Sequence, residues 1–158
     1  MSNSVTNLHA SAVIVHGNGI IIFGKSGSGK TSLALELIRQ AMRDGITAQL
    51  IADDRVTIER IEDQLVASAP ASIAGLIEVR GSGIHAIDYE KSATLHLAVE
   101  LVNAGKAERM APFAPKPVAH GLALPVLILP ENQIDGSIRA ILSHLGLYFP
   151  LLIQKNVE

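Results

Sequence analysis

The 158-residue sequence contains no cysteine and no tryptophan, and its only aromatic residues are two tyrosines and three phenylalanines. Without cysteine the protein has no disulfide bonds, thiolate metal ligands or cysteine nucleophiles. No apolar run approaches the roughly 18 residues that a membrane-spanning helix needs. Residues 1–7 lack the positive charge and the apolar stretch of a secretory signal peptide. The sequence therefore predicts a cytoplasmic protein with an aliphatic core and no membrane partner.

Charged residues are also sparse, at 18% of the chain, with a formal net charge of -2. A small negative net charge does not predict nucleic-acid binding, which depends on an excess of positive charge. Hydrophobic residues make up 48% of the sequence and the mean hydropathy is +0.33, which excludes a disordered chain. We expect one domain over residues 1–158 with its core at about 9–146. The high apolar content also predicts a homo-oligomer.

Apolar runs and turn signals predict a mixed α/β fold. Runs at 12–15 and 19–23 flank a Gly-Asn turn signal, which predicts an antiparallel hairpin. From Lys30 the apolar spacing becomes helical, and this helix is expected to end near Gly45. We expect further strands at 49–52, 56–58, 65–66, 77–80, 95–102 and 122–129, a long loop at 103–121 and a closing amphipathic helix at 134–145. The strand at 95–102 is expected to have one fully buried face.

A phosphate-binding loop joins the second strand to the first helix. It matches G-x-x-x-x-G-K-[ST] at every fixed position, and its residues are Gly24, Lys25, Ser26, Gly27, Ser28, Gly29, Lys30 and Thr31. Small residues let backbone N–H groups surround phosphate oxygens, and the helix N-terminus adds partial positive charge. Lys30, in a loop expected to face solvent, is predicted to reach the β/γ-phosphates, and the Thr31 hydroxyl to ligate Mg²⁺.

Two acids, Asp53 and Asp54, end the strand that follows this helix. In a wound sheet this strand end lies beside the phosphate loop. Because adjacent strand residues face opposite ways, one carboxylate can serve metal-bound water while the other faces a phosphoryl acceptor. The alternative interpretation is an acidic turn before Arg55.

Two further charged sites have alternative interpretations. Glu78 and Arg80 share one strand face, either as a surface ion pair or, because Gly81-Ser82-Gly83 follows, as part of a ligand site. Arg109 lies in the expected long loop, where on its own it is interpreted as a solvated charge.

Together these motifs resemble the catalytic domain of the HPr kinase/phosphorylase family, in its short single-domain form. The similarity extends over 9–101 and more loosely to 129, and its most specific stretch is Gly-Leu-Ile-Glu-Val-Arg-Gly-Ser-Gly-Ile at 75–84. The family transfers a phosphoryl group from ATP to a serine of the phosphocarrier protein HPr, and removes it by phosphorolysis. The resemblance thus implies a serine kinase that uses ATP and Mg²⁺, with HPr as partner and a hexamer as the oligomer.

The resemblance also assigns roles by position. Residues matching catalytic positions are His9, Lys30, Asp53, Asp54 and Arg109. Thr31 and Glu78 match metal ligands. The Asp pair matches the acids that deprotonate the acceptor serine; we favour Asp54 as the base and Asp53 as the metal or water partner, although the residues alone leave this choice open.

The chain departs from the family pattern at two places near the expected site. Lys25 stands where an aspartate is common, and Pro130-Glu131 stand where Gly-Arg is expected, in a stretch tied to phosphorolysis. The reverse activity and the exact acceptor therefore stay open. Two other functions are considered, a kinase of the same fold acting on a small hydroxyl-bearing metabolite and a nucleotide-sensing regulatory module. The intact acid pair favours an enzyme, because a sensor needs no base on the acceptor side.

Overall fold

The computed structural model describes residues 4–112 and 114–148. Its helices are α1 (Lys30–Arg43) and α2 (Ile134–His144), with 3-10 turns η1 (Ala71–Ile73) and η2 (Ala104–Lys106). Its strands are β1 (Val5–Val15), β2 (Asn18–Phe23), β3 (Ala48–Ala52), β4 (Arg55–Ile61), β5 (Gln64–Ser68), β6 (Leu76–Val79), β7 (Gly83–Ala86), β8 (Ser92–Val102), β9 (Lys116–Ala119), β10 (Leu122–Leu124) and β11 (Val126–Pro130). No helix in the described part of the chain is both long and apolar enough to cross a membrane.

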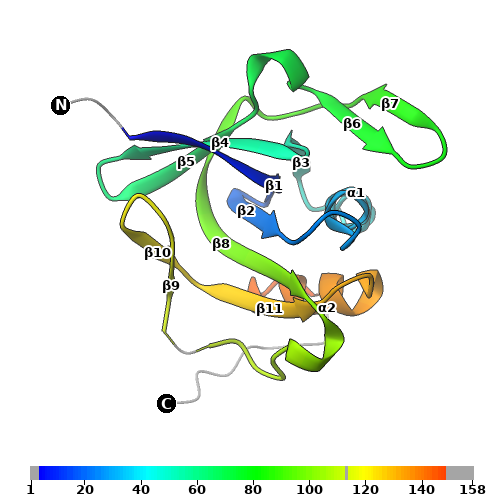
Figure 1. Cartoon of the computed structure of the whole chain (residues 1–158). Coiled ribbons are helices and arrows are strands. Elements are labelled where there is room, and N and C mark those ends of the chain that lie inside the picture. The colour runs from blue at the N-terminus through cyan, green and yellow to red at the C-terminus, as the bar shows by residue number, and fades with distance from the viewer. Residues whose placement is uncertain (1–3, 113, 149–158) are drawn as a thin grey trace.

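The main sheet has seven strands in the order β11-β8-β2-β1-β4-β5, with β3 paired to β1 outside this path (Figure 1). β8 runs parallel to both β2 and β11. Because β5 also pairs with β8, the strands β8, β2, β1, β4 and β5 close into a ring. The phosphate loop follows β2, next to the parallel strands β8 and β11.

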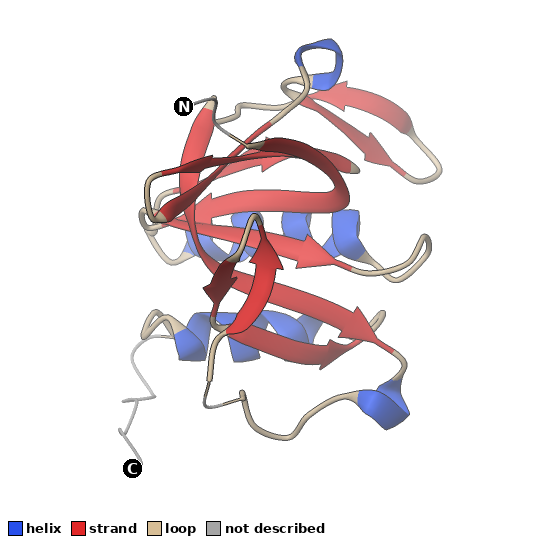
Figure 2. Cartoon of the chain, turned by 60° about the vertical axis from the view of Figure 1, so that its left-hand side comes forward, coloured by secondary structure: helices blue, strands red, loops and turns tan. Residues whose placement is uncertain are grey.

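Two hydrophobic cores cover the two faces of the sheet. Alternation along β2 sends Ile20 and Ile22 into the core shared with α1 and α2, whereas Ile21 faces the core enclosed by the ring. This two-sided burial explains why β2 is a continuous apolar run. The helices α1 and α2 pack against each other and against the first core (Figure 2).

The structure confirms most elements expected from the sequence. The hairpin of β1 and β2, the helix α1 and the final helix α2 lie where periodicity places them. The buried residues of α1 include the whole predicted apolar face, which is Leu33, Ala34, Leu37, Ile38 and Ala41.

Two expectations are wrong in detail. Residues 103–121 are not all loop, because β9 pairs with β10 through a turn at His120, where φ is +50°. The expected strand 122–129 is broken into β10 and β11 at Pro125, which has no N–H to donate to a neighbouring strand. The expected buried face of β8 is confirmed, because Leu95, Leu97, Val99 and Leu101 are all buried, and Ala98 is buried as well because β8 lies between the two cores.

The hairpin of β6 and β7 forms a separate two-stranded sheet that projects from the main sheet (Figures 1 and 2). Its second residue, Ile77, is buried in the core beside α1. Because Ile77 is fixed in the core, the next residue, Glu78, lies beside the phosphate loop.

Candidate active site

The phosphate loop lines a cavity of about 430 Å³ between β1, α1 and the β6–β7 hairpin. Its lining residues are His9, Ser26, Gly27, Gly29, Lys30, Thr31, Ser32, Leu35, Asp54, Glu78, Val79, Arg80 and Asn132. Gly29 precedes α1 with φ +97°, a backbone conformation that glycine adopts without strain. The strand, loop and helix context predicted for the motif is therefore present, and the cavity opens at the N-terminus of α1.

Lys30 is only 7% exposed, so the expectation of a lysine in a solvent-facing loop is wrong. Its ammonium group folds back under the loop and donates to the backbone oxygens of Gly24, at 2.7 Å, and Lys25, at 3.1 Å. Burial lowers the pKa of Lys30 from its ordinary value, and the charges of Asp54 and Asp53 oppose this shift. The side chain thus stabilises the loop and also places its positive charge at the cavity.

Asp53, at the end of β3, is 6% exposed and surrounded by donors. Its Oδ1 accepts hydrogen bonds from the hydroxyl of Thr31, at 2.7 Å, and from that of Ser11, at 2.9 Å. Its Oδ2 lies 3.4 Å from the backbone N–H of Glu78. Asp53 therefore connects β1, β3, α1 and the β6–β7 hairpin at the base of the site.

Asp54 has different surroundings. Its φ of +67° turns the chain away from the strand, and its side chain is 67% exposed. Its Oδ1 lies 3.0 Å from Nε2 of His9, on the neighbouring strand β1. The expectation that the two adjacent carboxylates face different surroundings is confirmed. One lies at the base of the loop, and the other lines the open cavity.

Glu78 and Arg80 both line this cavity, as their shared strand face predicts. In the part of the chain that the structure describes, no ion pair joins them. The interpretation as a surface ion pair is therefore not supported.

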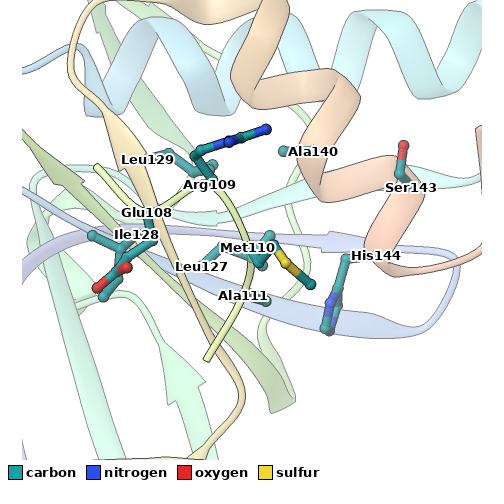
Figure 3. A pocket seen from close by; sticks show the side chains of 10 residues that line it. All are labelled: Glu108, Arg109, Met110, Ala111, Leu127, Ile128, Leu129, Ala140, Ser143 and His144. Carbon is teal, nitrogen blue, oxygen red and sulfur yellow. The ribbon is translucent and has the colours of Figure 1, made fainter. Parts of the chain in front are cut away.

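The structure does not bring Arg109 to the phosphate-loop cavity. Arg109 lines a second cavity of about 350 Å³, together with Glu108, Met110, Ala111, Leu127, Ile128, Leu129, Ala140, Ser143 and His144 (Figure 3). The loop that carries Arg109 runs along β11, where the N–H of Glu108 donates to the backbone oxygen of Ile128. It is therefore held at the β11 edge of the sheet, whereas the Asp pair lies on the other side of β2.

Sequence reasoning did not predict Ser32, Leu35 and Val79, which also line the cavity, nor two residues whose hydrogen bonds hold the site together. Ser11 is a buried polar residue in an otherwise apolar stretch of β1, and this pattern is the signal that points to a specific partner. Asn132 lies between β11 and α2, donates its side-chain Nδ2 to the backbone oxygen of Gly27 at 3.0 Å, and lines the cavity. Its signal is an amide side chain just after a strand end, at the edge where wound sheets bind ligands.

The donor set fits Mg²⁺. The Thr31 hydroxyl, the Asp53 carboxylate beside it and the carboxylate of Glu78, a residue that lines the cavity, are the hard oxygen ligands that this ion prefers. Within residues 4–112 and 114–148, no group of three or more His, Cys, Asp or Glu side chains is arranged to hold a metal. A nucleotide-type Mg²⁺ site uses one or two carboxylates together with phosphate oxygens and water.

Comparison with known proteins gives consistent matches. Residues 2–116 match the family model described as the HPr Serine kinase C-terminal domain. The HPr kinase/phosphorylase of Clostridium tetani is 48% identical over 79 residues, covering 50% of this chain and 24% of the relative. That of Bacillus licheniformis is 40% identical over 111 residues, covering 64% and 34%. The chain therefore spans only a quarter to a third of these relatives.

Among solved structures, the Hpr(Ser) kinase/phosphatase from Coxiella burnetii matches with a TM-score of 0.71. The match covers 89% of this chain and 88% of the solved chain, at 23% identity. At this level of identity the likeness establishes a shared fold.

Proposed function

The chain belongs to the HPr serine kinase C-terminal domain family, and from this premise we propose that it is an ATP-dependent protein-serine kinase acting on the phosphocarrier protein HPr. The observation that carries the proposal is that the side chains of Asp53 and Asp54 have different surroundings. The first is buried against Thr31, and the second lines the cavity beside His9. A nucleotide sensor needs the first arrangement but not the second.

In the proposed reaction the loop binds the phosphates of ATP through its backbone N–H groups and through Lys30. Thr31, Asp53 and Glu78 are the residues that would hold Mg²⁺, which when bound neutralises charge on the phosphate oxygens. Asp53 also fixes the first turn of α1, because it accepts the hydrogen bond of Thr31.

Asp54 is the proposed general base. It takes the proton of the acceptor serine while the serine Oγ forms a bond to the γ-phosphorus, and the bond from that phosphorus to the bridging oxygen breaks to release ADP. The imidazole of His9 lies 3.0 Å from this carboxylate and holds it in place. The exposure of Asp54 supports the choice of this residue, because a protein acceptor must reach it.

We further propose that the enzyme is a homo-oligomer, with a hexamer as the specific expectation, and that it is cytoplasmic because ATP is the donor. The hydrophobic side chains on its surface support self-association; among the described residues the large exposed ones are Val5, Met42, Ile61, Leu76, Ile84, Tyr89 and Met110. Sedimentation as a stable 16.7 kDa monomer at micromolar concentration contradicts this proposal.

The decisive experiment is incubation of the protein with γ-labelled ATP, Mg²⁺ and HPr, followed by mass spectrometry of HPr. Phosphoserine on wild-type HPr, absent when the acceptor serine is replaced by alanine, supports the proposal. A parallel sample of phosphorylated HPr with inorganic phosphate tests phosphorolysis through release of pyrophosphate. ATP binding without transfer to HPr contradicts the protein-kinase proposal and leaves the sensor or metabolite-kinase functions.

A further inference from the structure

Asn132 contacts the phosphate loop through both its backbone and its side chain. Its backbone N–H donates to the oxygen of Ser28 at 3.0 Å, and its Nδ2 donates to the oxygen of Gly27 at 3.0 Å. We propose that Asn132 is a positioning residue, which orients the peptide groups of the loop so that they bind the phosphates of the nucleotide. The inference rests on the proposed function only in naming the reaction that follows nucleotide binding. Measurements of nucleotide affinity test the role of Asn132 without any assay of transfer to HPr.

The geometry of the peptide group explains how a contact behind the loop orients its donors. In a trans peptide, C=O and N–H point in opposite directions. The carbonyl of Ser28 points to Asn132, so the N–H of Gly29 in the same peptide points away from Asn132. Within the described residues this N–H has no hydrogen-bond partner, and Gly29 lines the cavity. Asn132 thus leaves one loop N–H free for a phosphate oxygen.

The preceding peptide group is also fixed, but its N–H is used within the loop. The carbonyl of Gly27 is held by the Asn132 amide, and the N–H of the same peptide, on Ser28, donates to the oxygen of Lys25. Two successive peptide groups are therefore fixed, the first by an internal turn together with the Asn132 side chain and the second by the Asn132 backbone N–H. Without the Asn132 contacts these peptide groups can rotate. Phosphate binding then has to order them, and the conformational entropy that the loop loses lowers the affinity for the nucleotide.

Asn132 is itself rigidly placed. The preceding residue, Glu131, donates its N–H to the oxygen of Val102 at the end of β8, and α2 begins two residues later at Ile134. Its φ is +57°, a left-handed conformation in which asparagine is favoured over most other residues. The Oδ1 of Asn132 also lies 2.9 Å from where a Cβ at Gly29 would be, so the two positions fit closely. Because the position of Asn132 is fixed in this way, its hydrogen bonds restrict the conformation of the loop.

Asn132→Asp and Asn132→Gly separate the side chain from the backbone. Asp keeps the size and the left-handed conformation, but it removes the Nδ2 donor and places a negative charge beside the Gly27 oxygen. Gly keeps the backbone N–H bond and removes only the side chain. We expect Mg-ATP affinity to fall about 10-fold or more for Asp and about 3- to 10-fold for Gly, from the usual cost of a lost hydrogen bond. The KM for HPr is expected to remain unchanged, which a general structural defect would not produce.

Asn18→Asp is the matched control. Asn18 donates its Nδ2 to two backbone oxygens, those of Val15 and His16, in a turn at the opposite end of β2. This variant is expected to lower the melting temperature of the nucleotide-free protein as much as Asn132→Asp, with unchanged Mg-ATP affinity.

The measurements are Mg-ATP affinity by calorimetry, the melting temperature without nucleotide, and the KM values for Mg-ATP and HPr. If both Asn132 variants bind Mg-ATP as tightly as the wild type, or no more weakly than Asn18→Asp, the inference is wrong. If the wild type binds Mg-ATP but does not phosphorylate HPr, the proposed function is wrong, and the affinities of the variants still decide the role of Asn132. A wild type that does not bind Mg-ATP overturns both.

Discussion

The hydroxyl of Thr31 donates its only proton to Oδ1 of Asp53, 2.7 Å away. This bond determines what the hydroxyl can offer the cavity, because a hydroxyl that has used its donor presents oxygen lone pairs on its other side. The buried carboxylate thereby converts Thr31 into a pure acceptor, which is the form required of a metal ligand.

Thr31→Ala is expected to weaken nucleotide binding in the presence of Mg²⁺ by about tenfold, while binding without Mg²⁺ changes little. Thr31→Ser keeps the hydroxyl and is expected to bind almost as the wild type. Glu78→Ala is expected to reproduce the Mg²⁺-specific loss if Glu78 is the second ligand. Affinity titrations with and without Mg²⁺ measure all three variants. An equal loss in both conditions for Thr31→Ala would show that the hydroxyl acts through the loop rather than through the ion.

Asp54→Asn is expected to bind Mg-ATP normally but to lose phosphoryl transfer by about 10² or more, the usual contribution of a positioned base. Asp53→Asn is expected to differ, because it disturbs the hydrogen bonds from Ser11 and Thr31 and so weakens Mg-ATP binding as well. Single-turnover rates, measured together with the affinities for Mg-ATP, separate the loss of phosphoryl transfer from the loss of binding. Normal turnover in both variants would mean that the aspartate pair is only a structural turn.

The local elements were predictable from the sequence because their signals are local. The apolar face of α1 and the hairpin of β1 and β2 follow from spacing and turn residues within a few positions. The phosphate loop and the acid pair were found in the same way, and the family resemblance based on them is confirmed by the match over residues 2–116. The roles of the individual site residues remain predictions.

Contacts between distant segments were not predictable from local patterns. Closure of the ring by β5 and β8, the contact of Ser11 with Asp53 and the support of the loop by Asn132 depend on how strands far apart in sequence pair. Arg109 shows the same limit, because its place in the sequence matched a catalytic position while its loop lies along β11, beside the second cavity.

Lys30→Met is expected to abolish measurable transfer, with a loss of about 10² to 10³ or more, because it removes the positive charge from the phosphate site. Since Lys30 also donates to two loop carbonyls, we expect a moderate decrease in the free energy of unfolding, about 1–2 kcal/mol. Chemical denaturation measures this second effect, and Lys91→Met at an exposed position is the control. Wild-type turnover in Lys30→Met would show that this loop is not the catalytic one.

His144, in the last turn of α2, gives a prediction for pH. Burial lowers the pKa of His144 below its ordinary value of 6.5, so the unfolded chain takes up this proton more readily than the folded protein. The contribution of His144 to stability is therefore full above about pH 6.5 and decreases as the pH falls through that value toward the folded pKa. His144→Gln, which cannot be protonated, is expected to lose less stability between pH 7.5 and 5.5. Denaturation curves at both pH values test this, with His16→Asn at an exposed turn as the control.

The two departures from the family pattern near the site lie together in space. Nζ of Lys25, in the phosphate loop, is 3.9 Å from Oε1 of Glu131, in the turn after β11. The lysine replaces a common aspartate and the glutamate replaces an expected arginine, so the signs of both charges are reversed together. We interpret the pair as one compensating exchange that keeps an attraction between loop and turn.

Lys25→Asp alone is therefore expected to weaken Mg-ATP binding, because it places two carboxylates side by side at the loop, where they repel each other. Glu131→Arg alone is expected to leave two cations together and loosen the loop. In the double variant Lys25→Asp/Glu131→Arg, the attraction is restored with opposite polarity, and Mg-ATP affinity is expected to recover most of the loss. Because the lysine is 75% exposed, the coupling is expected to be small, about 0.2–1 kcal/mol, and to decrease with added salt. A double-mutant cycle of Mg-ATP affinities at low and high salt measures it, and additive effects at low salt would show that the two charges act independently.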